Sequence, residues 1–259
     1  MSIEALPFVN WIFWTALSAG SLLVVGLSEL LGGTTRGYRL FMAWVLVLFA
    51  GILLLSEMNL AAGSAVDSTS APRRALVVVF AAVSVAYLAA SILRLPRSGI
   101  AVLGGAIGML ALATLAAAGA TFSPMLFSVQ LILAALALGS VNAAMLLGHW
   151  YLVTPKLSAA PLRRMMWLLL AALAAQGVAF LVSVLTVSPE PLGGSLGPLT
   201  WLRLAVGIVL PIGITVLAML ASRAASLQAS TGLLYIGLAF VIAGSIAGAS
   251  ITYLTGVPV

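Results

Sequence analysis

Residues 39–62 read RLFMAWVLVLFAGILLLSEMNLAA, an apolar run long enough to cross the hydrocarbon core of a bilayer as one α-helix. The chain contains seven more runs of this kind on either side of it, with only short connections between them. The eight predicted helices span residues 7–32, 39–62, 75–93, 99–119, 126–154, 165–187, 201–222 and 230–256. We therefore predict an all-α, polytopic membrane protein of eight transmembrane helices, in which residues 1–259 form a single integral membrane domain.

The composition excludes several classes of protein. Charged residues make up 6% of the chain and hydrophobic residues 63%, and the mean hydropathy is +1.26, which leaves too little polar surface for a water-soluble globule of 259 residues. The net charge of +6 comes from arginines in loops rather than from one basic face, so the expected partner is the lipid bilayer and not nucleic acid. Cysteine is absent and histidine occurs once, so we expect no intrinsic haem, metal site or iron–sulfur cluster.

The positive charges fall mainly on alternate loops, and this pattern predicts an orientation. Those on or beside the loops after the first, third, fifth and seventh helices are Arg36, Arg39, Arg94, Arg97, Lys156, Arg163, Arg164 and Arg223. Those on the other side are Arg73, Arg74 and Arg203. Because Lys and Arg near helix ends are held in the cytoplasm, the bias places both termini on the non-cytoplasmic side of a prokaryotic-type cytoplasmic (inner) membrane. Met1 to Pro7 contains no Lys or Arg, so we expect the first helix to be retained rather than cleaved as a signal.

A faint internal repeat relates residues 1–120 to residues 121–259. Ala-Gly-Ser at 19–21 in the first helix matches Leu-Gly-Ser at 138–140 in the fifth. A repeat unit with an even number of helices gives halves that run in the same sense, and hence two parallel four-helix bundles. In a chain so rich in Leu, Ala and Gly the same matches also arise by chance, so both interpretations stay open.

Glycines in two helices are spaced for close packing. Gly104 and Gly108 in the fourth helix, and Gly244 and Gly248 in the eighth, form Gly-xxx-Gly patterns that let two backbones approach each other. The default interpretation is packing within the chain, and the alternative is a partner helix or a homo-oligomer formed through these faces. Pro211 in the seventh helix removes one backbone hydrogen bond and predicts a kink.

Two ionisable residues inside the predicted spans suggest proton chemistry. Glu29 continues a polar stripe with Thr15 and Ser18 at the helical period, so it should face the interior of the bundle. His149 lies at a similar depth in the fifth helix, which runs in the same direction as the first. A carboxylate beside an imidazole can exchange protons, so Glu29 and His149 are candidate catalytic residues. The alternative for His149 is a place in an interfacial aromatic belt with its neighbours.

Further polar and aromatic residues are candidates for binding a ligand. Glu57 lies near the outer end of the second helix and either is buried or extends into the headgroup region. Amides within the membrane most often form hydrogen bonds between helices, and they also line polar pockets. The candidates for ligand binding are Glu57, Asn142, Trp150 and Tyr151; Gln130 and Gln176 are further amides of this kind.

The first two helices carry a resemblance to a known family. The first contains Phe13-Trp14 and Ala-Gly-Ser-Leu-Leu at 19–23, Arg36 and Arg39 follow in a short turn, and the second continues from Trp44 to Ala-Gly-Ile-Leu-Leu-Leu at 50–55. This stretch resembles the opening of the NrfD/PsrC family of quinone-interacting membrane subunits. The resemblance implies two four-helix bundles, no bound redox metal in this subunit, electron-carrying partners outside the membrane, and quinol chemistry near the membrane surface. Glu57-Met58-Asn59-Leu60 stands where the family has an Asp-Leu-Gly-Arg-Pro type of ending, so Glu57 is only a loose positional analogue.

Three hypotheses about function follow. The first is an integral membrane subunit of a respiratory or other redox complex that provides a quinone-binding pocket and a proton path, with other membrane or peripheral redox subunits as partners. The second is a carrier or channel for a small solute or for protons, lined by the same polar side chains. The third is a non-catalytic membrane scaffold or assembly factor. The sequence leaves open whether the protein is an enzyme.

The predicted orientation is tested with reporter fusions in a bacterial host. We expect alkaline phosphatase to be active when fused at either end of the chain, because the positive-inside bias places both ends outside the cytoplasm. A fusion in the basic loop between Arg94 and Arg97 is the matched control and should be inactive. Active enzyme at that loop, together with inactive enzyme at both ends, would reverse the orientation.

Overall fold

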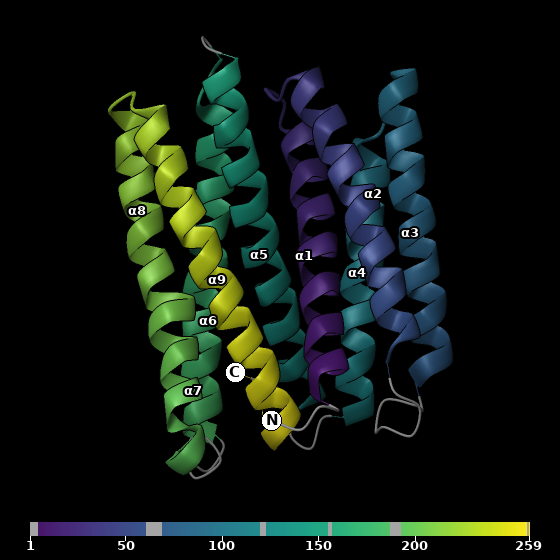
Figure 1. Ribbon diagram of the computed structural model, residues 1–259, viewed down its shortest axis with the longest axis vertical. Coiled ribbons are helices and arrows are strands. Elements are labelled where there is room, and N and C mark those ends of the chain that lie inside the picture. The colour runs from purple at the N-terminus through teal and green to yellow at the C-terminus, as the bar shows by residue number, and fades with distance from the viewer. Residues whose placement is uncertain (1–4, 61–68, 120–122, 155–156, 187–192, 258) are drawn as a thin grey trace.

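The computed structural model describes the chain except for residues 1–4, 61–68, 120–122, 155–156, 187–192 and 258. Every regular element in the described part is a helix, and eight segments are long and apolar enough to cross a membrane (Figure 1). Seven of these are continuous helices: α1 (Ala5–Leu30), α2 (Arg36–Met58), α3 (Ser70–Leu93), α4 (Ser98–Gly119), α5 (Pro124–Val153), α6 (Ala160–Thr186) and α9 (Leu227–Thr255). The prediction of an all-α, polytopic fold is confirmed.

The seventh segment, Gly194–Arg223, is a composite. It consists of the 3₁₀ turn η3 (Gly194–Leu196), the short helix α7 (Gly197–Trp201), the π-helix η4 (Leu202–Val209) and α8 (Leu210–Arg223). The predicted irregularity at Pro211 therefore extends over the two turns before the proline. Pro211 has no N–H, and its ring crowds the preceding turn, so wider turns at this position relieve the clash. The N–H of Leu210 closes the π-helix by donating to the carbonyl of Ala205.

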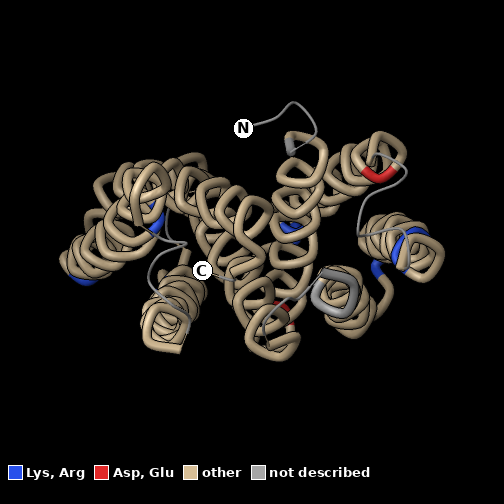
Figure 2. Tube along the Cα trace, turned by 90° about the horizontal axis from the view of Figure 1, so that it is seen from below, with Lys and Arg blue, Asp and Glu red and all other residues tan. Residues whose placement is uncertain are grey.

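The helices form two neighbouring groups. The spans α1 to α4 lie on one side and α5, α6, α8 and α9 on the other, with α1 and α5 next to each other at the centre (Figure 1). Viewed along the helices, the described part of the chain is elongated rather than round, and few charged residues interrupt it (Figure 2). This division falls at the predicted boundary between 1–120 and 121–259, and the internal repeat itself remains a prediction.

The two groups meet where α1 and α5 touch through their backbones. A Cβ atom added to Gly20 would overlap the carbonyl of Ala135, and one added to Gly139 would overlap the backbone of Gly20. Glycine is therefore required on both helices at this crossing. One turn further along, the amide of Asn142 donates a hydrogen bond of 2.9 Å to Oγ of Ser21, so close packing and a buried polar contact act together.

The predicted glycine faces pack within the chain. Gly104 and Gly108 lie against Leu22 and Ala19 of α1. Gly244 of α9 lies directly against the backbone of Gly207 in η4, and Gly248 faces the side chain of Arg203. The interpretation of these glycines as packing surfaces within the chain is confirmed, and the chain's own helices cover all four positions.

The crossing of α1 and α5 generates a stability prediction. Gly139→Ala should lower the Tm in detergent by about 5 °C or more, because the added methyl group forces apart two backbones in contact, and overpacking of this kind costs about 1–3 kcal/mol. The matched control is Gly51→Ala on α2, where a Cβ atom meets nothing within 4 Å. Equal Tm values for the two variants, measured by thermal unfolding, would contradict the proposed constraint.

Candidate functional site

Glu57 in α2 forms a buried ion pair with Arg73 in α3. The Nε atom of Arg73 lies 3.2 Å from each carboxylate oxygen, and the two side chains are 3% and 4% exposed. The guanidinium also lies 5.7 Å from the centroid of the Trp11 ring, a distance typical of a cation–π contact. Of the two alternatives for Glu57, the structure shows the buried one, and its role in binding a ligand remains a prediction.

Glu29 near the end of α1 has partners on two other segments. Its Oε2 lies 3.2 Å from Nε of Arg97, in the turn before α4, and the hydroxyl of Tyr87 in α3 donates a hydrogen bond to Oε1. The polar stripe on α1 faces the interior as predicted, since Thr15 and Ser18 are completely buried. The carboxylate is therefore held between an arginine and a phenol at the end of the bundle away from the N-terminus of α1.

His149 has a different partner, so the structure does not bring it together with Glu29. The imidazole is exposed, and its Nδ1 lies 3.2 Å from the hydroxyl of Tyr235 in α9. Helical rotation explains the separation. Glu29 follows Gly20 by nine residues, about 900° of rotation, so it points half a turn away from the face that touches α5. The carboxylate thus faces α3 and α4, and the predicted proton-exchanging pair is not formed.

The other three candidate ligand-binding residues are distributed over separate contacts. Asn142 bonds to Ser21 at the crossing of α1 and α5. The ring of Trp150 stacks on Phe41 of α2 at 6.4 Å between centroids, and the hydroxyl of Tyr151 donates to the carbonyl of Ser158 at 2.8 Å. These contacts join α5 to α1, to α2 and to the segment that follows α5, and they lie apart from one another. Their roles toward a ligand remain predictions.

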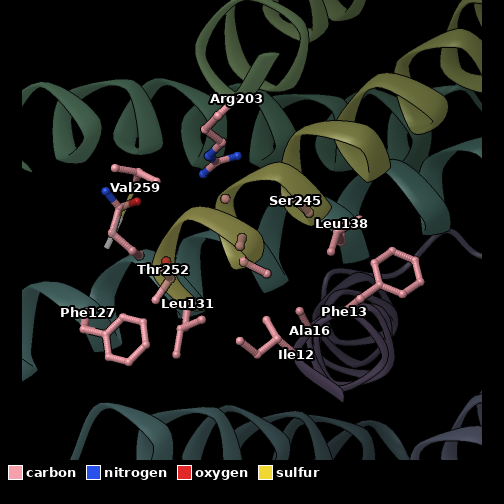
Figure 3. A pocket seen from close by; sticks show the side chains of 14 residues that line it. Ile12, Phe13, Ala16, Phe127, Leu131, Leu138, Arg203, Ser245, Thr252 and Val259 are labelled. Atoms are coloured by element: carbon pink, nitrogen blue, oxygen red, sulfur yellow. The ribbon is translucent and has the colours of Figure 1, made fainter. Parts of the chain in front are cut away.

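Arg203 in η4 marks a site that the sequence analysis did not single out. Its side chain is only 2% exposed and extends toward α9, into a pocket enclosed by α1, α5, η4 and α9 (Figure 3). The space between these side chains, counted together with the open solvent at its mouth, is about 420 Å³, and the part enclosed within the protein is much smaller. Most of its wall is apolar and comes from α1 and α5, with Ile12, Phe127, Leu131 and Leu138 among the lining residues.

Several hydrogen-bonding atoms at this pocket have no partner within the described residues. They are Nε of Arg203, both amide atoms of Gln130, and Oγ of Ser245 on α9. With the Gln176 amide oriented to accept, its oxygen receives a hydrogen bond of 3.2 Å from Nη2 of Arg203, so α6 holds one side of the guanidinium. Buried polar atoms are normally hydrogen-bonded, so three unsatisfied side chains around one cavity indicate a binding site.

Arg203 forms no ion pair with an aspartate or glutamate side chain in the part of the chain that the structure describes. Of the acids placed there, Glu57 pairs with Arg73 and Glu29 with Arg97. The remaining acids lie outside the described residues: Glu4, Asp67 and Glu190. In the sequence analysis Arg203 was used only as one of the positive charges from which the orientation in the membrane was predicted. A signal was nevertheless present, because this arginine lies inside the predicted span 201–222, where a charge is costly.

The Glu57–Arg73 ion pair generates a prediction about stability. Glu57→Gln should destabilise the protein by about 3 kcal/mol, because it removes the carboxylate from a buried ion pair. The double variant Glu57→Gln, Arg73→Gln should recover most of that loss, since neither charge then remains. Unfolding of the purified variants in detergent measures both effects. A double variant less stable than the single one would show that Arg73 stabilises the fold independently of Glu57.

Comparison of the chain with protein-family models, with curated proteins and with solved structures finds no match. The interpretation of the site therefore depends on its own geometry. That geometry is a half-open apolar pocket in an eight-span membrane protein, with one buried arginine, one amide and one hydroxyl directed at it.

Proposed function

We propose that this chain is an integral membrane subunit of a redox complex and that it binds the head group of a membrane quinone in the Arg203 pocket. The observation that carries the proposal is the set of unpartnered polar atoms on Arg203, Gln130 and Ser245 around an apolar cavity. This combination of a mostly hydrophobic lining with a few convergent polar groups is typical of sites for small amphipathic molecules.

The chemistry of the pocket is complementary to a quinone. The head group carries two carbonyl oxygens that accept hydrogen bonds, and Arg203, Gln130 and Ser245 can donate them. Phe13 and Phe127 line the same cavity and offer aromatic surface to a flat ring. An isoprenoid tail would leave the pocket through its open side. Each donor satisfied in this way removes the penalty of a buried, unpaired polar group.

The pocket lies near one end of the bundle, where a bound quinone could exchange electrons with redox subunits at one membrane surface. Ile12 and Gln130 lie within about two turns of the starts of α1 and α5, at the end of the bundle where α1 begins and α9 ends (Figure 1). The charge bias predicts this end to be outside the cytoplasm. The chain has one histidine and no cysteine, so electrons would have to come from separate redox subunits.

A proton path through Glu29 would be separate from the proposed head-group site. Seventeen residues of α1 separate Ile12 at the pocket from Glu29, which corresponds to about 25 Å along the helix. Proton exchange at the bound quinone would therefore use water or partner groups at the pocket's own surface. We propose no direct catalytic role for Glu29 or His149 in quinone binding.

Quinone binding is tested on protein purified from a quinone-producing membrane. We expect extraction and mass spectrometry to recover quinone from the wild-type protein, and about tenfold less from Arg203→Gln and from Gln130→Leu, because each change removes a donor at the pocket. Arg164→Gln is the matched control, since it removes an arginine whose side chain bonds to the carbonyls of Leu31 and Gly32 at the other end of the bundle. Absence of quinone from the wild-type protein, in extracts and after addition of quinone, would overturn the proposal.

A further inference from the structure

The turn between α3 and α4 presents an arginine between exposed apolar side chains. Arg94 directly follows the last residue of α3, and its side chain is exposed. Its neighbours Ile92, Leu93 and Leu95 are 49%, 66% and 51% exposed. Because α3 is one of the membrane-spanning helices and ends at Leu93, the turn lies at the level of the lipid head groups. At that level apolar side chains contact the lipid chains, and a guanidinium reaches the phosphates.

The backbone at Arg94 has the left-handed helical conformation. Its φ is +60° and its ψ is +30°, and its N–H donates to the carbonyl of Ala90. The N–H of Leu95 donates to the same carbonyl at 2.9 Å. Helices that end in this way commonly have glycine at the left-handed position, because a Cβ atom is crowded there. An arginine where glycine would be less strained points to a role of its side chain.

The cluster around Glu29 holds this turn in place. Nη1 of Arg97 donates to the carbonyl of Leu95 at 3.3 Å, and Nε of Arg97 lies 3.2 Å from Oε2 of Glu29. The hydroxyl of Tyr87 in α3 donates to the other oxygen of the same carboxylate. The end of α1 and the end of α3 thus fix the backbone next to Arg94, so its side chain is presented from a supported turn.

Positive charge is in excess at this end of the bundle. Arg36 and Arg223 are exposed on two other turns at the same end, between α1 and α2 and between α8 and α9 (Figure 1). Among the described residues, neither they nor Arg94 form an ion pair, and the one acid placed at this end, Glu29, already pairs with Arg97. Basic residues at a membrane surface attract lipids whose head groups carry a net negative charge.

We propose that the turn 92–96 binds an anionic phospholipid. The guanidinium of Arg94 contacts the phosphate, for which its planar fork of donors is well shaped, and the three apolar side chains beside it contact the acyl chains. The pocket at Arg203 lies near the other end of the bundle, so lipid binding at this turn does not depend on quinone binding.

The test measures which lipids stay bound to the full chain. Protein is released from nanodiscs that contain equal amounts of phosphatidylglycerol and phosphatidylcholine, and bound lipids are identified by native mass spectrometry. We expect the wild-type protein to retain more phosphatidylglycerol than phosphatidylcholine. Arg94→Gly should lower this ratio about fivefold, the factor that corresponds to about 1 kcal/mol for one basic residue near an anionic surface. Its Tm should not fall, because glycine relieves the crowding at φ +60°.

Ala225→Gly is the matched control. Ala225, between α8 and α9, is the other non-glycine residue with a positive φ in the part of the chain that the structure describes, and its φ is also +60°. The change therefore alters the backbone in the same way at the same end of the bundle without removing a charge. We expect the ratio of the two lipids to stay at the wild-type value.

A soluble phosphate compound tests whether the lipid chains matter. Glycerol 3-phosphate carries the phosphate without acyl chains, so we expect it not to displace phosphatidylglycerol at equal concentration. Displacement would indicate a site for free phosphate compounds and would overturn lipid binding.

Three other results would overturn the proposal. Equal retention of both lipids by the wild-type protein would remove the preference for anionic lipid. A wild-type ratio in Arg94→Gly would remove the role of Arg94. An equal fall of the ratio in Arg94→Gly and Ala225→Gly would attribute the effect to the backbone rather than to the guanidinium.

Discussion

The contact between the backbones of Gly20 and Gly139 is the constraint on which the rest of this structure depends. Lipid tails are as apolar as the side chains they surround, so helices in a membrane associate through close packing and buried hydrogen bonds. The crossing of α1 and α5 supplies both, since Asn142 bonds to Ser21 one turn away. Every other span packs against one of these two central helices or against a neighbour of theirs. The position of the Arg203 pocket follows from this arrangement, because α1 and α5 form most of its wall.

The few ionisable groups inside the bundle fall into two kinds. Glu29 and Glu57 are each paired with an arginine, and these pairs join α1, α2 and α3 to their neighbours. Arg203 instead faces an apolar cavity with two further unsatisfied side chains. Buried ion pairs of the first kind fix the relative positions of helices, whereas polar atoms without a partner beside a cavity are a feature of a binding site.

The sequence predicted the fold well because span length and apolar composition are local properties. Helices α3 and α6 begin about five residues earlier than predicted, since Pro72 and Pro161 fit the first turn of a helix. The separation of Glu29 and His149 could not have been predicted from the sequence, because it follows from the tertiary crossing of α1 and α5 at Gly20 and Gly139. The pocket could not be predicted either, because its polar groups come from three helices whose relative placement depends on tertiary packing. The irregular turns before Pro211, by contrast, were indicated by the sequence, because a proline disturbs the helical turn that precedes it.

The π-helical stretch Leu202–Val209 determines how the Arg203 side chain is rotated about the helix axis relative to the side chains of α8. A π-turn accommodates an extra residue within an otherwise α-helical segment, so it shifts the angular phase of everything that follows. Loss of a single residue here would restore a regular helix, yet it would turn the guanidinium by about 100° relative to the face of α8 that contacts α9. The number of residues in this stretch therefore determines the direction in which the Arg203 side chain points.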